Sequence, residues 1–229
     1  KGNVVKRSHR IGTLAVSLAT VCGLVACSGA ETTPTAGNEA GAAATTQTRS
    51  AEGAVTVTDA AGRTLQFDEL PERIVLAEGR AAYATALLQD NPLDNVVAYG
   101  QDLEKAAGAF REKLFEMQPE AKDMPEIGMI HKGDVTVENL LAQKPDVVIM
   151  TLDQKKSVEE SGFISDLDAA GITYAFIDFR QKPLENTTVS MQLLGDLLGQ
   201  SERAQKYNEF YQAKVKEITD RAAKIADKP

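Results

Sequence analysis

The sequence predicts an α/β lobe in which helices flank a parallel sheet, followed by one long helix. Three observations predict this fold class. Four short apolar runs occur after Pro71, and each has the character of a strand that is buried on both faces. Segments with helical periodicity separate these runs, so that strands and helices alternate. Residues 201–226 then repeat apolar side chains at spacings of three and four, as one long helix would.

An export signal precedes the lobe. Residues 1–10 are basic, Ile11–Gly23 is an uncharged apolar run, and the box Leu24-Val25-Ala26-Cys27 follows. This order is typical of a secretory signal peptide, and the run is shorter than the ~20 residues of a membrane-spanning helix. We interpret residues 1–27 as a lipoprotein signal with Cys27 as the lipid acceptor. A secreted protein with a chance cysteine at this place is the alternative.

Cysteine content and charge exclude several classes of function. Cys22 lies inside the signal, so the mature protein has no disulfide and no thiol for catalysis or metal binding. All 33 acidic residues follow Cys27, whereas four of the 25 basic residues precede it, which leaves a net charge of −12. Such a surface disfavours nucleic acid. The chain also lacks a Gly-rich phosphate loop and a serine-elbow motif.

The elements follow in order along the chain. Residues 28–53 contain no aromatic or large aliphatic side chain, so we expect a disordered linker. A hairpin of Val55–Thr58 and Thr64–Phe67 comes next, with Gly62 in its turn. The expected strands of the parallel sheet are Ile74–Ala77, Val96–Tyr99, Val147–Met150 and Tyr174–Ile177. The expected helices cover residues 81–88, 105–117, 137–142, 158–170 and 184–198, with an N-cap at Thr136 and a capping box from Ser157 to Glu160.

Together these segments resemble the N-terminal lobe of substrate-binding proteins of ABC importers for iron-siderophores, haem and vitamin B12. The resemblance runs from about Val55 to Pro229 and is carried by five pieces in the same order: Val57–Thr64, Pro71–Val75, Val137–Ile149, Leu193–Gly199 and the long helix. It implies two α/β lobes joined by a rigid helix, with the ligand held between them. On this basis residues 54–199 are the N-terminal ligand-binding lobe, residues 200–229 are the inter-lobe helix, and the second lobe is absent from this sequence.

Candidate ligand-binding residues lie where the predicted strands end, because open parallel sheets bind ligands beyond the carboxyl ends of their strands. Arg80 follows a strand and a glycine at a helix N-terminus, where a guanidinium and backbone N–H groups can hold an anion, and Arg180 follows the same logic. The alternative for Arg80 is an exposed arginine that only forms salt bridges. Tyr83 either stacks on an aromatic ligand or packs its helix on the sheet. The full set is Glu78, Gly79, Arg80, Tyr83, His131, Lys132, Asp153 and Arg180.

Two further residues have more specific expectations. His131 is the only histidine of the mature chain, and its imidazole is a candidate haem ligand, although a lone loop histidine is usually only exposed. The resemblance implies that Glu138, on the first turn of its helix, pairs with permease arginines, whereas favouring the helix dipole is its simpler role. We expect Val137, Leu140 and Leu141 to face inward on the same helix.

The resemblance favours a monomeric, extracytoplasmic, lipid-anchored solute-binding protein. It would capture a ferric siderophore and deliver it to an ABC permease, without a cofactor and without chemistry of its own, either in a periplasm or on the cell-wall side of a membrane. One alternative is haem capture through His131 or Tyr83. A second alternative is a lipid-anchored surface enzyme or an adhesion module.

Overall fold

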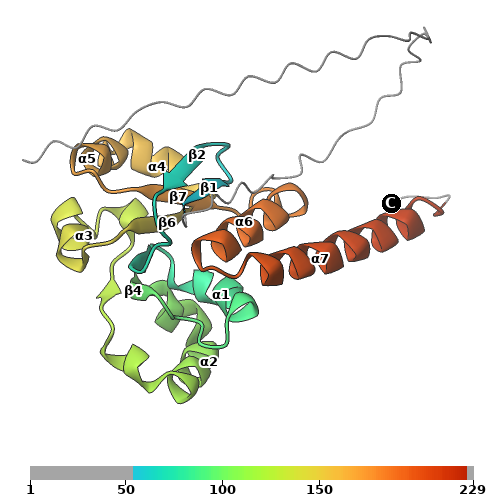
Figure 1. Ribbon diagram of the computed structural model, residues 1–229, viewed down its shortest axis with the longest axis horizontal. Coiled ribbons are helices and arrows are strands. Elements are labelled where there is room, and N and C mark those ends of the chain that lie inside the picture. Colours follow the sequence, from blue (N-terminus) through green and yellow to red (C-terminus); the bar gives the residue numbers. More distant parts are fainter. Residues whose placement is uncertain (1–53, 226–229) are drawn as a thin grey trace, which may run out of the picture. The chain divides into compact units, whose positions relative to one another are not determined.

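The structure is a computed structural model that describes residues 54–225 (Figure 1). The predicted signal, the lipid acceptor Cys27 and the predicted linker 28–53 lie outside the described residues, as does the end of the expected long helix beyond residue 225.

A five-stranded parallel sheet forms the centre of the lobe, in the order β5-β4-β3-β6-β7. The sequence predicts four of these strands. It misses the edge strand β5, which has only two residues and therefore no detectable period. The strands are β3 (Ile74–Leu76), β4 (Val96–Gly100), β5 (Glu126–Ile127), β6 (Val147–Thr151) and β7 (Tyr174–Ile177).

Helices cover both faces of this sheet, as the near-continuous apolar strands predict. One face carries α1 (Ala82–Leu88), α2 (Asp102–Met117) and α6 (Pro183–Leu197). The other carries α3 (Val137–Gln143), α4 (Lys155–Glu160) and α5 (Phe163–Ala169). Single 3₁₀ turns connect these elements: η1 (Gly79–Ala81), η2 (Pro119–Asp123), η3 (Ile130–Lys132) and η4 (Leu152–Gln154).

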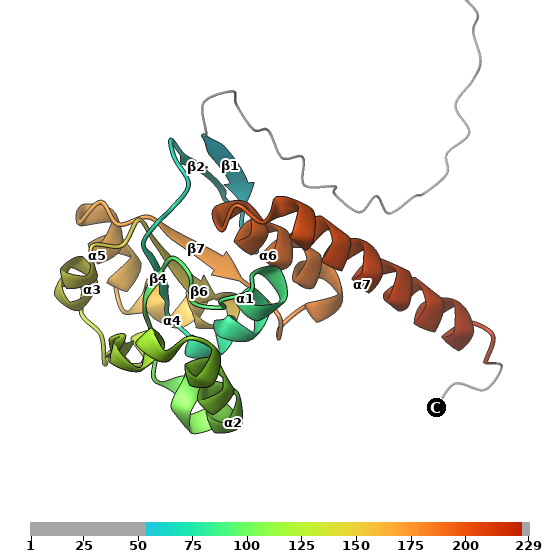
Figure 2. The ribbon, with the colours of Figure 1, turned by 60° about the horizontal axis from the view of Figure 1, so that its bottom comes forward.

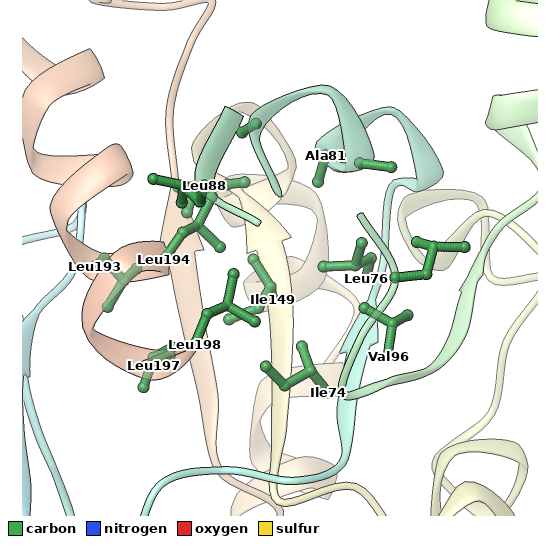
Figure 3. Close-up of a cluster of buried hydrophobic side chains, with 14 of the residues drawn as sticks. Ile74, Leu76, Ala81, Leu88, Val96, Ile149, Leu193, Leu194, Leu197 and Leu198 are labelled. Atoms are coloured by element: carbon green, nitrogen blue, oxygen red, sulfur yellow. The ribbon is translucent and has the colours of Figure 1, made fainter. Parts of the chain in front are cut away.

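The buried side chains divide between the two faces by strand alternation. Ile74 and Leu76 of β3 pack with Ile149 of β6 against α1 and α6, where Leu88 and Leu194 meet them (Figure 3). The intervening strand residues, among them Val75, Val148 and Phe176, belong to the second cluster under α3 to α5. Burial of apolar surface contributes roughly 25 cal/mol per Å². A shift of one strand by one residue would move each side chain to the opposite face, so the two clusters fix the strand register.

The hairpin of β1 (Val55–Thr58) and β2 (Thr64–Phe67) is attached to the sheet through the turn between its strands. Asp59 is buried in this turn and accepts hydrogen bonds from the backbone N–H groups of Ala61, Arg63 and Phe176. The Arg63 guanidinium pairs with Asp59 and lies over the Tyr174 ring, 4.1 Å from its centroid. One carboxylate thus joins the hairpin to β7.

A second carboxylate joins two motifs that are far apart in the sequence. Asp146, the last residue of the Lys-Pro-Asp segment before β6, accepts backbone N–H groups of Glu72 and Arg73, each at 2.9 Å. The Arg73 side chain donates to the carbonyl oxygens of Gln143 and Lys144. These bonds align the starts of β3 and β6, which pair in the sheet.

Two local predictions are wrong, and one is confirmed in a different form. The helix expected from Lys105 begins at Asp102, whose side chain turns back toward η1. Ser157 is not an N-cap, because η4 runs directly into α4, which begins at Lys155. The Ser157 hydroxyl instead donates to the His131 carbonyl. Thr136 does cap α3, with Asn139 as the reciprocal partner of the capping box.

The long helix α7 (Ser201–Ala222) follows α6 and packs beside it (Figure 2). Gly195 of α6 allows this approach, since a Cβ there would lie 2.4 Å from the Ala204 Cβ. Farther along α7, Phe210 and Ile218 are 62% and 64% exposed. Between residues 54 and 225, no helix combines the length and apolar character that crossing a membrane requires.

Candidate functional site

A pocket of about 360 Å³ lies at the carboxyl ends of β3, β6 and β7. The sheet order places β4 and β5 on one side of β3 and β6 and β7 on the other, so the pocket lies at the switch point of the sheet. Its lining residues are Glu78, Arg80, Ala81, Tyr83, Ala84, Leu87, Thr151, Ile177, Phe179, Arg180, Met191 and Tyr207.

Glu78 is the polar centre of this pocket. It follows β3, is only 5% exposed, and its carboxylate accepts hydrogen bonds from four side chains. Thr151 Oγ1 donates at 3.2 Å, Gln154 Nε2 at 2.9 Å, Arg180 Nη2 at 2.7 Å, and Arg80 Nη2 at 3.5 Å. A buried carboxylate needs such partners, and here they come from the ends of β6 and β7 as well as from η1.

Arg80 is held by a second carboxylate, which belongs to the start of α2. Arg80 Nε donates to Asp102 Oδ2 at 2.8 Å, and the backbone N–H of Gly79 donates to Asp102 Oδ1 at 2.7 Å. A Cβ on residue 79 would lie 2.3 Å from the carbonyl oxygen of Gly100. Glycine is therefore required for β3 and β4 to end side by side with Arg80 between Glu78 and Asp102.

Arg180 enters the pocket from the loop after β7. Its Nη2 donates to Glu78, to Thr151 Oγ1 and to both carboxylate oxygens of Asp153. Burial alone would lower the pKa of Arg180, but the hydrogen bonds to Asp153 and Glu78 raise it overall. Burial likewise opposes ionisation of Asp153, yet hydrogen bonds from Thr151 and Arg180 lower its pKa. The guanidinium thus stays charged and fixed in place.

Some N–H groups of both arginines remain without a protein partner. Within residues 54–225, no hydrogen bond involves Nη1 of Arg80, nor Nε or Nη1 of Arg180. The two side chains are 36% and 40% exposed. These donors can therefore bind oxygen atoms of a molecule that enters the pocket.

Asp178 shapes the loop that carries Arg180. It is buried and accepts the backbone N–H groups of Arg180, Gln181 and Lys182 together with Nδ2 of Asn186. Burial alone would raise the pKa of Asp178, but these hydrogen bonds lower it below the usual value. Because Pro183 begins α6 directly afterwards, Asp178 fixes both the loop and the helix start.

Aromatic and aliphatic side chains form the rest of the wall. The Tyr83 ring lies against Phe110 of α2, with ring centroids 4.2 Å apart, and it is 48% exposed. Packing of Tyr83 between helix and sheet, which the sequence left open, is therefore not its role. Tyr207 reaches the pocket from α7, and Phe179 reaches it from the loop before Arg180.

The structure brings together only part of the predicted set. Glu78, Arg80, Tyr83 and Arg180 line the pocket, while Gly79 and Asp153 support the two arginines. His131 and Lys132 lie in η3, after the edge strand β5, and are not among the lining residues. The His131 carbonyl accepts the Ser157 hydroxyl, and His131 Nδ1 is buried without a hydrogen-bond partner among residues 54–225.

Sequence reasoning missed four polar or aromatic residues of the site. Thr151 follows the predicted strand Val147–Met150 and extends it by one residue, whereas Asp102 lies before a helix that was expected to begin at Lys105. Asp102 lies two residues after the end of β4, so the strand-end rule could have found it if it had been applied to this strand as well. Phe179 lies in the strand-end segment that contains Arg180, and Tyr207 belongs to the apolar repeat of the long helix, but only the tertiary packing brings their side chains to the pocket.

Glu138 lies away from this pocket, at the exposed first turn of α3. The hydrogen bonds with Thr136 and with its own backbone lower the pKa of Glu138. The expectation that Leu141 faces inward is wrong, since it is 46% exposed, while Leu140 is fully buried. Glu138 and Leu141 line a second, wide hollow of about 690 Å³ between α3 and α5, which also contains Phe163 and Asp166.

Comparison with known proteins identifies the fold and the family. A model of the family "Periplasmic binding protein" matches residues 115–229, which is half of the chain. The TroA-like periplasmic binding protein FepB from Veillonella parvula is 28% identical, with a TM-score of 0.68 over 76% of this chain and 50% of that one. No curated protein sequence matches the chain.

Two more distant structures share the fold. A periplasmic solute binding protein from Veillonella parvula DSM 2008 is 19% identical, with a TM-score of 0.58 over 77% of this chain and 50% of that one. The siderophore binding protein BauB is 17% identical, with a TM-score of 0.51 over 76% of this chain and 56% of that one. The chain thus spans about half the length of these solved structures. From the family match and the shared lobe, we conclude that this chain belongs to the periplasmic binding protein family.

Proposed function

We propose that this protein is an extracytoplasmic, lipid-anchored solute-binding protein that captures a ferric siderophore and delivers it to an ABC permease. Membership of the periplasmic binding protein family supports the general role of solute capture. The ligand, the anchor and the permease are the parts that we add, and each has its own support and its own test.

The observation that carries the ligand proposal is the pocket with its two arginines. A ferric siderophore presents oxygen atoms around the iron and an organic body around those oxygens. The unused N–H groups of Arg80 and Arg180 suit the first, and the wall of Tyr83, Phe179 and Tyr207 suits the second. BauB, which shares this fold, is described in complex with ferric iron and two molecules of acinetobactin, so the fold accommodates such a ligand.

Binding to the full-length protein tests this proposal. We expect isothermal titration calorimetry to detect saturable binding of at least one ferric siderophore, and weaker binding of the same siderophore without iron. Emission of tyrosine, of which this chain contains five, is a second readout. Absence of binding across hydroxamate, catecholate and mixed chelates would reject the ligand class.

The anchor proposal rests on Cys27, which follows the uncharged run Ile11–Gly23 and the small residue Ala26. Two or more acyl chains hold a protein stably on a membrane. We expect the protein to fractionate with membranes and to incorporate radiolabelled palmitate, and the variant Cys27→Ser to lose the label. The matched variant Cys22→Ser should keep it, and equal labelling of both variants would reject Cys27 as the acceptor.

The permease proposal rests on Glu138. Its side chain is exposed, its pKa is lowered through Thr136, and it lies at the rim of the α3–α5 hollow, apart from the ligand pocket. We expect Glu138→Ala to reduce iron-chelate uptake by cells without changing affinity for the chelate. The control Glu160→Ala removes an exposed glutamate from α4 and should preserve uptake. A loss of ligand affinity in Glu138→Ala would reject a docking role.

Haem remains the second candidate ligand, because the exposed Tyr83 ring lines the pocket and a phenolate can ligate haem iron. His131 is less well placed for this role, since it does not line the pocket. For the alternative of a surface enzyme, turnover of a substrate that is lost in Arg80→Ala would be the supporting observation.

A further inference from the structure

Glu78, Arg80 and Arg180 line the pocket, and two carboxylates just outside it, Asp102 and Asp153, pair with the arginines. Arg80 pairs with Glu78 and Asp102, and Arg180 pairs with Glu78 and Asp153. Two positive and three negative side chains therefore form one connected cluster, whose formal net charge is −1. The two arginines of the pocket are thus more than balanced by the carboxylates with which they pair.

Neighbouring lysines do not reverse this balance. Lys155, in the first turn of α4, pairs with Glu159, and Lys182, just before α6, pairs with Glu185. Beyond the pocket, the segment after Cys27 has a net charge of −12. The long-range field of this segment therefore repels a highly charged anion rather than attracting it.

Glu78 is the carboxylate that would lie closest to an anion bound in the pocket. It lines the pocket, is nearly buried, and stands between the two arginines, whereas Asp102 belongs to the start of α2 and Asp153 is 37% exposed. Thr151 and Gln154 also donate to Glu78, so its charge is fixed in place rather than free to move aside. Repulsion between like charges is stronger at a buried carboxylate than in bulk water, because the effective dielectric constant there is lower.

The same cluster suits ligands with little or no charge. The unused N–H groups of Arg80 and Arg180 can donate to neutral oxygen atoms, and most of the remaining lining residues are apolar or aromatic. Iron(III) bound by three hydroxamate groups is neutral, because each group carries one negative charge. Iron(III) bound by three catecholate groups is trianionic, because each group carries two.

We infer, building on the proposed function, that this pocket selects ferric chelates of low charge, of the trishydroxamate class, over trianionic triscatecholates, and that Glu78 determines this selectivity. Glu78 thus acts as a fixed counter-anion. It neutralises the arginines for a neutral chelate and excludes one with several negative charges.

Calorimetry on the full-length protein tests the selectivity with two probes, ferrichrome as a neutral ferric trishydroxamate and ferric enterobactin as a trianionic ferric triscatecholate. We expect ferrichrome to bind about tenfold or more tightly than ferric enterobactin. Equal or tighter binding of ferric enterobactin would overturn the inference while leaving siderophore capture intact. Binding of neither probe nor of any other ferric chelate would overturn the proposed function, and this inference with it.

Variants test the role of Glu78. The near-isosteric Glu78→Gln should shift the affinity ratio about tenfold toward the triscatecholate, because it removes the central charge but keeps an oxygen acceptor. The variant Asp153→Asn should shift the affinity ratio in the same direction by less, because the Asp153 side chain is 37% exposed and its charge is better screened by solvent. This variant provides a test even if Glu78→Gln fails to fold. The control Glu160→Gln removes an exposed charge from α4 and should leave the ratio unchanged. An unchanged ratio in the folded pocket variants would overturn the role of Glu78.

Discussion

Nη2 of Arg180 lies 2.7 Å from the Glu78 carboxylate, although the two residues are 102 positions apart in the sequence. The pair joins the end of β3 to the loop after β7, on either side of the end of β6. Glu78 also contacts Arg80, which Asp102 holds more closely, so one buried carboxylate connects both guanidinium groups. The polar part of the pocket is thus a single network rather than a set of independent side chains.

Arg180→Gln tests how far ligand binding depends on this network. We expect the variant to bind a ferric siderophore at least about tenfold more weakly, because it loses a charged donor to the ligand and leaves Glu78 and Asp153 partly unpaired. Arg180→Lys should be intermediate, since lysine keeps the charge but not the planar fork. The control Arg203→Gln loses only an exposed pair with Asp90, so unchanged affinity is expected there. Full affinity in Arg180→Gln would place the ligand elsewhere.

Hemin titration separates the two ligand candidates. If haem is the cargo, the Soret band should shift on binding, and Tyr83→Phe should abolish the shift, because the variant keeps the ring but lacks the ligating oxygen. His131→Ala should leave the spectrum unchanged, because His131 does not line the pocket. A spectrum that depends on His131 instead would contradict this placement. No Soret shift at all would leave siderophore capture as the candidate.

The sequence predicts most of the fold because its strands are buried on both faces. In such strands every residue is apolar, so Ile74 and Val148 are recognisable without knowledge of their neighbours. The edge strand Glu126–Ile127 and the start of α2 at Asp102 were missed because each depends on contacts with distant segments. Helix and strand signals are local, whereas these two features are tertiary.

The site was predictable to a smaller extent, for a related reason. The strand-end rule places Glu78, Arg80 and Arg180 near one another, because parallel strands end at the same edge. The rule also selected His131, which follows the edge strand β5. This strand is separated from β3 by β4, so His131 lies away from the switch point between β3 and β6. Strand order decides which strand ends meet, and a single sequence does not contain that order.

Gly79→Ala tests the close approach of β3 and β4 beneath Arg80. The new Cβ would lie 2.3 Å from the Gly100 carbonyl oxygen and 2.7 Å from the Leu103 Cβ, and neither atom can turn aside. We expect a loss of about 1–3 kcal/mol in the free energy of unfolding, measured by urea denaturation. Gly108→Ala is the matched control, because nothing lies within 4 Å of its Cβ in α2. That variant should gain up to about 1 kcal/mol, and equal effects would contradict the steric account.

Asp178 makes stability depend on pH in a predictable direction. Its pKa in the folded protein is below the ordinary aspartate value of 3.8, since four N–H donors outweigh the effect of burial. A lowered pKa contributes stability that is fully present above the unfolded value and is lost as the pH falls through the folded value.

Asp178→Asn should therefore cost about 1–3 kcal/mol at neutral pH, where asparagine cannot accept all four bonds. The difference from the native protein should shrink as the pH falls below the ordinary aspartate value, as measured by thermal unfolding. The exposed Asp68→Asn should leave the curve unchanged. A difference for Asp178→Asn that stays constant down to the lowest pH would show that these hydrogen bonds are not the source of the stabilisation.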